Sequence, residues 1–168
     1  MKKQLLSLVI TILSLNCYAQ ISFEKGYYIN NVGQRVECRI RNVDWKNNPK
    51  TFEYKLSEDT APKTATIKSV KEFGIYNISK YRRHIVKLDR SSKNINQLST
   101  KKDPAFGEEE LFLKVLVEGK ANLYFFEEGN LRRFFYNTDT SEIMPLIFKT
   151  YLTPENQIVE NNSFKQQL

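Results

Sequence analysis

The sequence predicts a mainly β fold: an antiparallel β-sandwich or open barrel built from hairpins and a meander, with at most short helical turns and, as an option, a C-terminal helix. Apolar and charged residues alternate with period two over most of the chain, a pattern typical of strands with one buried face. Asn and Gly separate these runs at hairpin spacing. Hydrophobic residues fill 40% of the 168 positions and aromatic residues 12%, which is enough apolar area for one packed domain.

The first predicted hairpin joins residues 27–30 to residues 35–41 through a turn at 31–34. Asn and Gly in that turn tolerate a positive φ, which tight hairpin turns need. We expect Cys38 to be buried on the return strand as a small apolar residue. The apolar face of that strand consists of Val36, Cys38 and Ile40.

Three more strands follow from the same alternation. Residues 52–56 predict a third strand, which leads into a polar connection at 57–62. Residues 81–88 predict another strand, and the polar stretch 90–107 predicts a long mobile loop. A last strand is predicted around residues 143–148.

One segment shows a different spacing. Ile67, Val70 and Phe73 lie three residues apart, and Gly74 follows them. A spacing of three with a terminal glycine is typical of a short helix with a glycine cap. The sequence therefore predicts a single helical turn between two strands.

The strongest local pattern runs from Leu111 to Tyr136 and predicts a three-stranded meander. Gly119-Lys120 and Gly129-Asn130 suit two-residue type II′ turns, in which the glycine takes the positive φ. These turns also fix the register of the strands on either side of them. The predicted cross-strand pairs are Leu116 with Leu123, Lys114 with Phe125, Glu127 with Arg132, Phe125 with Phe134, and Leu123 with Tyr136.

This register makes both faces of the meander apolar. A half-solvated antiparallel sheet has one polar face, so the second face of the meander needs a cover. We expect the chain itself to supply it through other strands or a C-terminal helix, and the alternative is a partner molecule. One of the two faces would hold Leu113, Val115, Val117, Tyr124, Phe126 and Phe135.

Residues 1–19 have the pattern of a secretory signal peptide. Two lysines precede an apolar run at 5–15, and Cys17 and Ala19 place small side chains where signal peptidase cleaves. A membrane-spanning anchor would need about 20 apolar residues, and Asn16 disfavours a lipid anchor on Cys17. We expect cleavage after Ala19 and export to the periplasm, to an outer-membrane-associated position or to the medium.

Removal of this leader leaves a single β-rich domain at 20–152 and a polar C-terminal tail at 153–168. It also lowers the net charge from +7 to +5, because Lys2 and Lys3 leave with the leader. The remaining chain has one His and one Cys, which excludes the usual metal-ligand clusters and a disulfide framework. We expect no cofactor and no bound metal.

No motif in the sequence indicates a catalytic site, and the Gly-x-x-x-x-Gly-Lys-Ser/Thr loop of nucleotide-binding enzymes is absent. His84 lies among arginines, which disfavour its protonated form. The neighbouring carboxylates at 108–110 would point to opposite faces of a strand. We therefore expect a non-catalytic protein, and the alternative is a hydrolase of envelope glycan or lipid whose carboxylates are brought together by the fold.

Two basic and aromatic segments resemble the pattern of a single-stranded nucleic-acid site. In the run 132–136 the aromatic residues pair within the predicted meander, and export separates the chain from nucleic acid. We expect no nucleic-acid partner and keep the other segment as a candidate basic binding cluster. That cluster consists of Tyr81, Arg82, Arg83 and Lys87.

A modification site is also indicated in the polar connection. Asp59-Thr60-Ala61 resembles the Asp-Ser/Thr-apolar acceptor that bacteria of the Bacteroidetes group use for O-glycosylation. Thr60 is therefore a candidate for O-glycosylation.

Four segments carry a resemblance to a family: QISFEKGY at 20–27, VDWKNNP at 43–49, VKEFGIY at 70–76 and FLKVLVEGK at 112–120. Together they resemble a family of uncharacterised exported proteins of Flavobacteria and other Bacteroidetes. The resemblance implies an all-β envelope protein and supplies no catalytic residue. Some members carry a similar region ahead of an outer-membrane β-barrel; others are labelled tRNA modification GTPases, a label that does not transfer because this sequence has no GTPase motif.

These features together predict an exported binding or interaction module of the bacterial cell envelope, which acts through an apolar and basic surface. The expected partner is an envelope protein or an anionic envelope component. Peripheral association with a membrane fits the same kind of surface. The sequence leaves the oligomeric state open.

Overall fold

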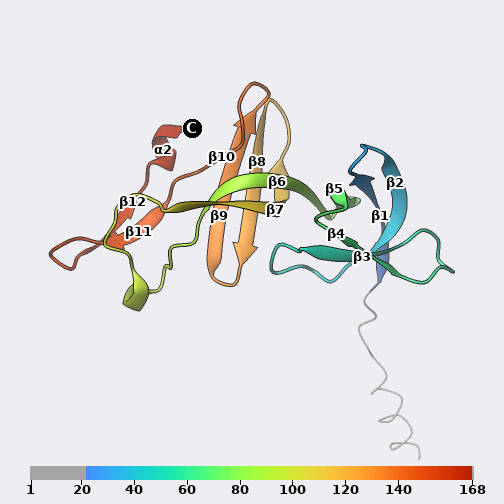
Figure 1. Ribbon diagram of the computed structural model, residues 1–168, viewed down its shortest axis with the longest axis horizontal. Helices are drawn as coiled ribbons and strands as arrows, with labels where there is room; N and C mark the ends of the chain where they lie inside the picture. The colour runs from blue at the N-terminus through green and yellow to red at the C-terminus, as the bar shows by residue number, and fades with distance from the viewer. Residues whose placement is uncertain (1–21, 168) are drawn as a thin grey trace, which may run out of the picture.

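The computed structural model describes residues 22–167, so the predicted signal peptide lies outside the described residues. The main sheet is built from β1 (Phe23–Asn30), β2 (Arg35–Arg41), β3 (Thr51–Lys55), β4 (Lys63–Thr66), β5 (Val70–Ile75), β6 (Ser79–Asp89), β7 (Phe106–Val117), β8 (Ala121–Glu128), β9 (Leu131–Thr138) and β10 (Met144–Pro145). It is antiparallel, with the order β10-β9-β8-β7-β6-β5-β1-β2-β3-β4, and it curls into a half-barrel (Figure 1). The prediction of a mainly β, open-barrel fold is confirmed.

The first hairpin forms as predicted. β1 pairs with β2 so that Gly26 faces Cys38 and Tyr28 faces Val36. Gly33 takes a φ of 85° in the connecting turn. Cys38 is buried, and burial raises the pKa of its thiol to about 12.

The predicted helical turn near Val70 is wrong. Val70, Phe73 and Ile75 belong to β5, which pairs with β1 on one side and with β6 on the other. β5 is central in the sheet, and Phe73, Gly74 and Ile75 are buried in succession, so the polar half of the usual strand alternation is missing there. Val70 and Phe73 both reach the first core although they lie three residues apart, because the register of β1 and β5 shifts next to Val70.

Two hydrophobic cores lie on opposite faces of the one sheet. On β7, Phe112 belongs to the first core, while its neighbours Leu111 and Leu113 belong to the second, because successive strand residues point to opposite faces. The first core consists of Cys38, Ile40, Phe52, Ala65, Val70, Phe73, Ile75, Tyr81 and Phe112. The second consists of Val86, Leu88, Leu111, Leu113, Tyr124, Phe126 and Phe135.

Trp45 covers the first core from the loop between β2 and β3. Its ring meets the rings of Phe73 and Tyr81 edge-on, with centroids 5.6 Å apart in both cases. The second core lies inside the curl of the sheet, where β10 comes into contact with β6. β6 and β7 therefore contribute side chains to both cores.

The meander forms, with one correction to its register. The pairs of the second hairpin, such as Glu127 with Arg132, are as predicted, and Gly129 has a φ of 58°. In the hairpin of β7 and β8, an irregularity between Val115 and Val117 places Val117, not Leu116, opposite Leu123. This β-bulge turns Val117 onto the face opposite the one that the sequence predicted.

The turn that precedes β8 also differs from the prediction. Gly119 does not take the positive φ that a type II′ turn requires of it. With the bulge in β7, the two strands no longer need that turn geometry to reach each other. The glycine at 119 was a correct sign of a turn and a wrong sign of its type.

Asn48 joins β7 to β8 where their ladder has opened. The described pairing of these strands begins at Lys114. Beyond it, Asn48 Nδ2 donates to the carbonyl oxygens of Phe112 (2.7 Å) and Phe125 (2.9 Å). Its Oδ1 accepts from the N–H of Glu127 (2.9 Å), and its own N–H donates to the Glu127 carbonyl (2.8 Å). One residue thus replaces a stretch of backbone ladder.

The C-terminal segment forms a small second sheet and a short helix. Of the predicted last strand at 143–148, only Met144–Pro145 forms a strand, β10. β11 (Lys149–Leu152) begins just after the predicted strand and pairs with β12 (Ile158–Asn161). The helix α2 (Phe164–Gln167) follows, so the optional C-terminal helix is present. The segment predicted as a polar tail therefore contributes β12 and α2.

The predicted long loop after β6 includes one turn of 3-10 helix, η1 (Ile95–Gln97). Backbone groups of this loop are bonded to the second sheet. Lys149 Nζ donates to the Asp103 carbonyl at 2.7 Å, and the N–H of Leu152 donates to the Ser99 carbonyl at 3.0 Å. The loop is thereby tied to the C-terminal segment.

Candidate functional site

The structure does not bring the predicted basic cluster together on one surface. Tyr81 is buried in the first core and stacks on Phe73 at 5.1 Å. Arg82 and Arg83 point to opposite faces of β6, as neighbours on a strand must. Lys87 is exposed farther along β6 and lies opposite Glu108 of β7. A binding role for these residues stays a prediction.

Arg82 belongs to a polar network of β1, β5 and β6, on the face of the sheet that also carries the second core. Its Nε donates to Glu72 Oε2 at 2.6 Å, and one terminal nitrogen donates to Glu118 Oε1 at 2.7 Å. The Tyr27 hydroxyl donates to the other oxygen of Glu72 at 2.7 Å. Burial and this bond to Glu72 raise the pKa of Tyr27.

The carboxylates of this network are neutralised by cations. Glu118 also accepts from Lys80, and this hydrogen bond lowers the pKa of Glu118. Glu72 lies within 3.9 Å of the same ammonium group and is bound to Arg82. With its lowered pKa, Glu118 stays ionised and has no proton to give, so this pair does not suit the acid and nucleophile roles of a glycosidase.

His84 is the one histidine of the sequence, and it is largely buried. Its ring meets the Tyr124 ring edge-on at 4.8 Å, and its Nε2 has no hydrogen-bond partner within residues 22–167. Burial, and then the charge of Arg82, lower the pKa of His84 to about 4. The imidazole is therefore neutral at physiological pH.

This burial predicts a pH-dependent stability. As the pH falls below about 6.5, the unfolded chain takes up a proton on His84 while the folded chain does not, so stability is lost between about pH 6.5 and pH 4. Urea unfolding should show a loss of about 1–2 kcal/mol between pH 7 and pH 5. In His84→Phe, which cannot titrate, that loss should disappear; an unchanged loss in this variant would contradict the assignment to His84.

A cavity of about 660 Å³ lies on the outer face of β8 and β9. We call it the β8–β9 pocket. Its lining is mostly apolar and aromatic, with a few cationic residues. The lining residues are Lys93, Val117, Ala121, Asn122, Leu123, Arg132, Arg133, Phe134, Tyr136, Leu146, Phe148 and Phe164.

The floor of the pocket comes from strand alternation in the meander. Phe135 of β9 points inward and is fully buried in the second core, so Phe134 and Tyr136 point outward. Leu123 of β8 lies opposite Tyr136, and the bulge in β7 adds Val117 beside it. Phe134 remains 41% exposed and Val117 53% exposed, so this apolar floor is only partly covered.

The C-terminal segment forms the wall of the pocket. Leu146, Phe148 and Phe164 line it, and the rings of Phe148 and Phe164 meet edge-on at 6.4 Å. The Gln167 side chain fastens this wall, because it accepts from the N–H of Ile147 at 2.8 Å and donates to the Pro145 carbonyl at 3.0 Å. The chain itself therefore covers part of the second face of the meander, as predicted, and leaves the rest open.

Three cationic residues, Lys93, Arg132 and Arg133, also line the pocket. Arg132 is paired with Glu127 at 2.6 Å, and buried Arg133 donates to the carbonyl oxygen of Asp89 at 2.9 Å. Lys93 Nζ lies 4.7 Å from the centre of the Phe148 ring. Burial, followed by the charges of Arg133 and Arg132, lowers the pKa of Lys93.

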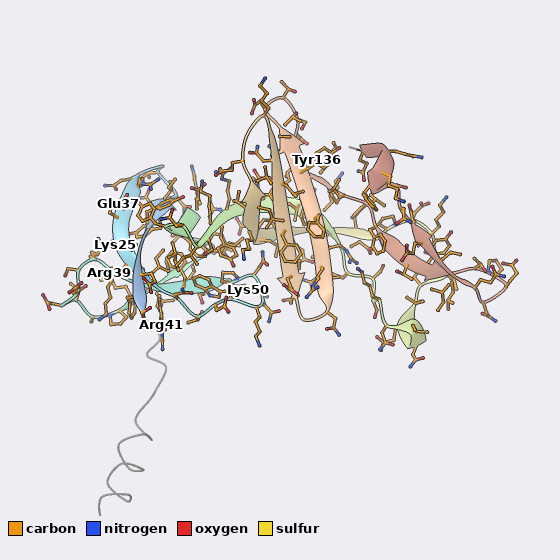
Figure 2. All side chains as sticks on the ribbon, turned by 180° about the vertical axis from the view of Figure 1, so that it is seen from behind. Lys25, Glu37, Arg39, Arg41, Lys50 and Tyr136 are labelled. Atoms are coloured by element: carbon orange, nitrogen blue, oxygen red, sulfur yellow. The ribbon has the colours of Figure 1, made fainter. Side chains whose placement is uncertain are left out.

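The β8–β9 pocket lies away from β1 and β2, which form one end of the molecule. Figure 2 shows Tyr136 on β9 near the middle of the molecule, and Lys25, Arg39 and Arg41 on β1 and β2 at that end. On those strands Arg39 is paired with Glu58, and Arg41 with Glu53. The β8–β9 pocket thus combines apolar and basic groups in a way that the β1–β2 surface does not.

Sequence reasoning found the floor of this pocket and noted Arg132 and Arg133 as a basic segment, but it did not predict the wall as a neighbour of β9, and it missed Lys93. Two apolar faces in the meander were a sufficient signal for Leu123, Phe134 and Tyr136. Phe148 ends the apolar run at 143–148, Phe164 stands in the polar C-terminal segment, and Lys93 lies in a loop. No local pattern marks these residues as neighbours of β9.

Thr60 lies on the exposed turn between β3 and β4. Its hydroxyl donates to the Ser57 carbonyl at 2.9 Å and accepts from the Ser57 N–H at 3.2 Å. These bonds fix the turn. O-glycosylation of Thr60 stays a prediction.

No family model, curated protein or solved structure matches this chain. The resemblance to exported proteins of the Bacteroidetes therefore stays a prediction. Within residues 22–167, no group of three or more His, Cys, Asp or Glu side chains could hold a metal ion. The described helices are too short to cross a membrane.

Proposed function

We propose that the protein is an exported, non-catalytic binding module of the bacterial cell envelope that takes an apolar group into the β8–β9 pocket. One observation supports this most strongly: aromatic side chains line a cavity of about 660 Å³, and Phe134 among them remains partly exposed to solvent. Binding sites for small ligands have volumes of about 300–1,000 Å³ and consist mostly of apolar and aromatic side chains.

The packing of the rest of the fold supports a binding role for this cavity. Phe135, next to Phe134, is fully buried, so the sheet has a complete core without Phe134. An apolar patch that stability does not need, and that water can reach, is typical of an interaction site. The wall fixed by Gln167 keeps the pocket formed in the unbound chain.

The lining favours binding over catalysis. Among the described residues that line the pocket there is no Asp, Glu, His, Ser or Cys. General acid–base and nucleophilic catalysis depend mainly on such groups. The lining does include Lys93 and Tyr136, which can also act in catalysis, but no carboxylate or imidazole stands beside them among these lining residues. The carboxylates elsewhere that we examined for a hydrolase, Glu72 and Glu118, are bound to Arg82.

The uncharged dye Nile red tests the pocket directly. We expect the folded protein, purified from cells that express the full chain, to bind the dye with a rise in fluorescence. Phe134→Glu places a charge on the pocket floor and should weaken binding by about tenfold or more, because burying an unpaired charge is costly. Phe134 is partly exposed, so the variant should still fold.

Ile78→Glu is the matched control, since Ile78 is an exposed apolar residue outside the pocket lining. This variant should bind Nile red like the wild type. Equal binding by Phe134→Glu, or no binding by the wild type, would reject the pocket as a binding site. Recovery of the protein only in the cytoplasmic fraction of the native cell would reject the export part of the proposal.

A further inference from the structure

We propose that the ligand of the β8–β9 pocket is a single-chain amphiphile with an anionic headgroup, a free fatty-acid anion, whose carboxylate lies at Lys93 and whose chain lies along Phe134 and Tyr136. This inference rests on the proposed function and names the ligand class. Three features of the pocket support it: the sign of its charge, the order of its groups along β9, and its walls.

The charge of the lining is positive and incompletely compensated. The pocket is lined by Lys93, Arg132 and Arg133, and the described lining residues include no carboxylate. Arg132 and Arg133 have acidic partners, Glu127 and Asp89. Within residues 22–167, no carboxylate forms an ion pair with Lys93. An anionic headgroup is the complement of this site.

Lys93 is placed to meet a headgroup and a chain together. Its Nζ lies 4.7 Å from the centre of the Phe148 ring, so the ammonium group adjoins the apolar wall. Although Lys93 is exposed as a whole, partial burial and the neighbouring arginines lower its pKa and make its charged form less favourable. A carboxylate at this position would relieve that cost and form a charge-assisted hydrogen bond.

The groups along β9 run from basic to apolar. Arg132, Phe134 and Tyr136 share the outer face of the strand at alternate positions, over about 13 Å. Lys93 lies at the Arg132 end, since it lines a neighbouring cavity together with Asn130 and Leu131 at the start of β9. Toward the other end the lining continues with Ala121 and Val117. An amphiphile has the same order of charge and apolar length.

The walls favour one chain from solution over a membrane surface. Phe134 and Leu123 form the floor, and Leu146, Phe148 and Phe164 rise beside it on a hydrogen-bonded segment. A bilayer would be met by apolar side chains that project from the surface. Here the apolar side chains line a concave site, which encloses a ligand of small cross-section.

Two soluble amphiphiles and one kind of lipid vesicle test the inference. Binding of the amphiphiles is measured by displacement of Nile red. Dodecanoate and dodecyltrimethylammonium have the same chain and opposite charge, and both are used as monomers. We expect dodecanoate to bind about tenfold more tightly than the cationic amphiphile. Vesicles of phosphatidylglycerol, tested by co-sedimentation, should not retain the protein.

Lys93→Gln should weaken dodecanoate binding by about five- to tenfold, a clearly larger loss than for Nile red, which carries no charge for Lys93 to meet. Lys101→Gln removes another exposed lysine of the same loop, outside the pocket lining, and should change neither affinity. Both side chains are exposed, so both variants should fold.

The outcomes separate this inference from the proposed function. If the two amphiphiles bind with equal affinity, or if Lys93→Gln does not change dodecanoate binding, the inference of an anionic ligand is wrong. Nile red binding would in that case still support the pocket as a binding site. Retention on vesicles without binding of monomeric dodecanoate would overturn the inference in favour of a membrane surface. Failure to bind Nile red would reject the proposed function itself.

Discussion

Gly26→Ala is expected to lower the free energy of unfolding by about 3 kcal/mol or more. A Cβ at this position of β1 would lie 2.3 Å from the backbone oxygen of Gly74 on β5 and 3.2 Å from the Ile40 side chain. The first contact is with backbone, which can move away only if β1 and β5 separate. Because β1 joins the first hairpin to the rest of the sheet, that movement would loosen the first core.

Gly107→Ala is the matched control for this substitution. Gly107 lies in β7 of the same sheet, and a Cβ there would meet nothing within 4 Å. The control should change stability by less than about 0.5 kcal/mol. Urea unfolding of both variants measures the difference, and equal stability would contradict the close approach of β1 to β5.

Asn48→Ala is expected to cost about 3 kcal/mol. The side chain makes three hydrogen bonds to backbone groups of β7 and β8, each contributing about 1 kcal/mol net. Its loss leaves the Phe112 and Phe125 carbonyls and the Glu127 N–H unpaired where the strands have separated. Because these groups border the pocket strands, Nile red binding should weaken together with stability.

The neighbouring Asn47→Ala removes a comparable side chain with a smaller role. Asn47 Oδ1 accepts a single exposed hydrogen bond, from the N–H of Gly129 at 2.8 Å. We expect a cost of about 0.5–1 kcal/mol. If urea unfolding gave the two variants the same stability, the role of Asn48 as the link between β7 and β8 would be wrong.

The sequence predicted those strands that alternate in polarity or that are bounded by turn glycines. The first hairpin and the second turn of the meander formed in the predicted register, because alternating residues and turn glycines act locally. β5 was missed because it is buried on both faces, and a run such as Phe73-Gly74-Ile75 carries no alternation. Its identity as a strand depends on neighbours that come from distant parts of the chain.

The candidate site was predictable in part. The floor followed from the two apolar faces of the meander, but the bulge that brings in Val117 has no local signal. The partners of Arg82, namely Glu72 and Glu118, are 10 and 36 residues away in sequence, so its neutralisation could not be read from its own strand. Phe164 lines the pocket from α2, and the sequence pattern of the meander at 111–136 gives no sign that this distant helix packs beside it.

The central claim is that an amphiphile binds on the outer face of β8 and β9, and a dodecanoate titration followed by amide NMR tests it most directly. We predict shifts confined to residues 93–94, 117–123, 132–136, 146–148 and 164, with Phe134 and Tyr136 among the largest. Shifts centred on β1 and β2, or no shifts at dodecanoate concentrations that displace Nile red, would contradict the claim.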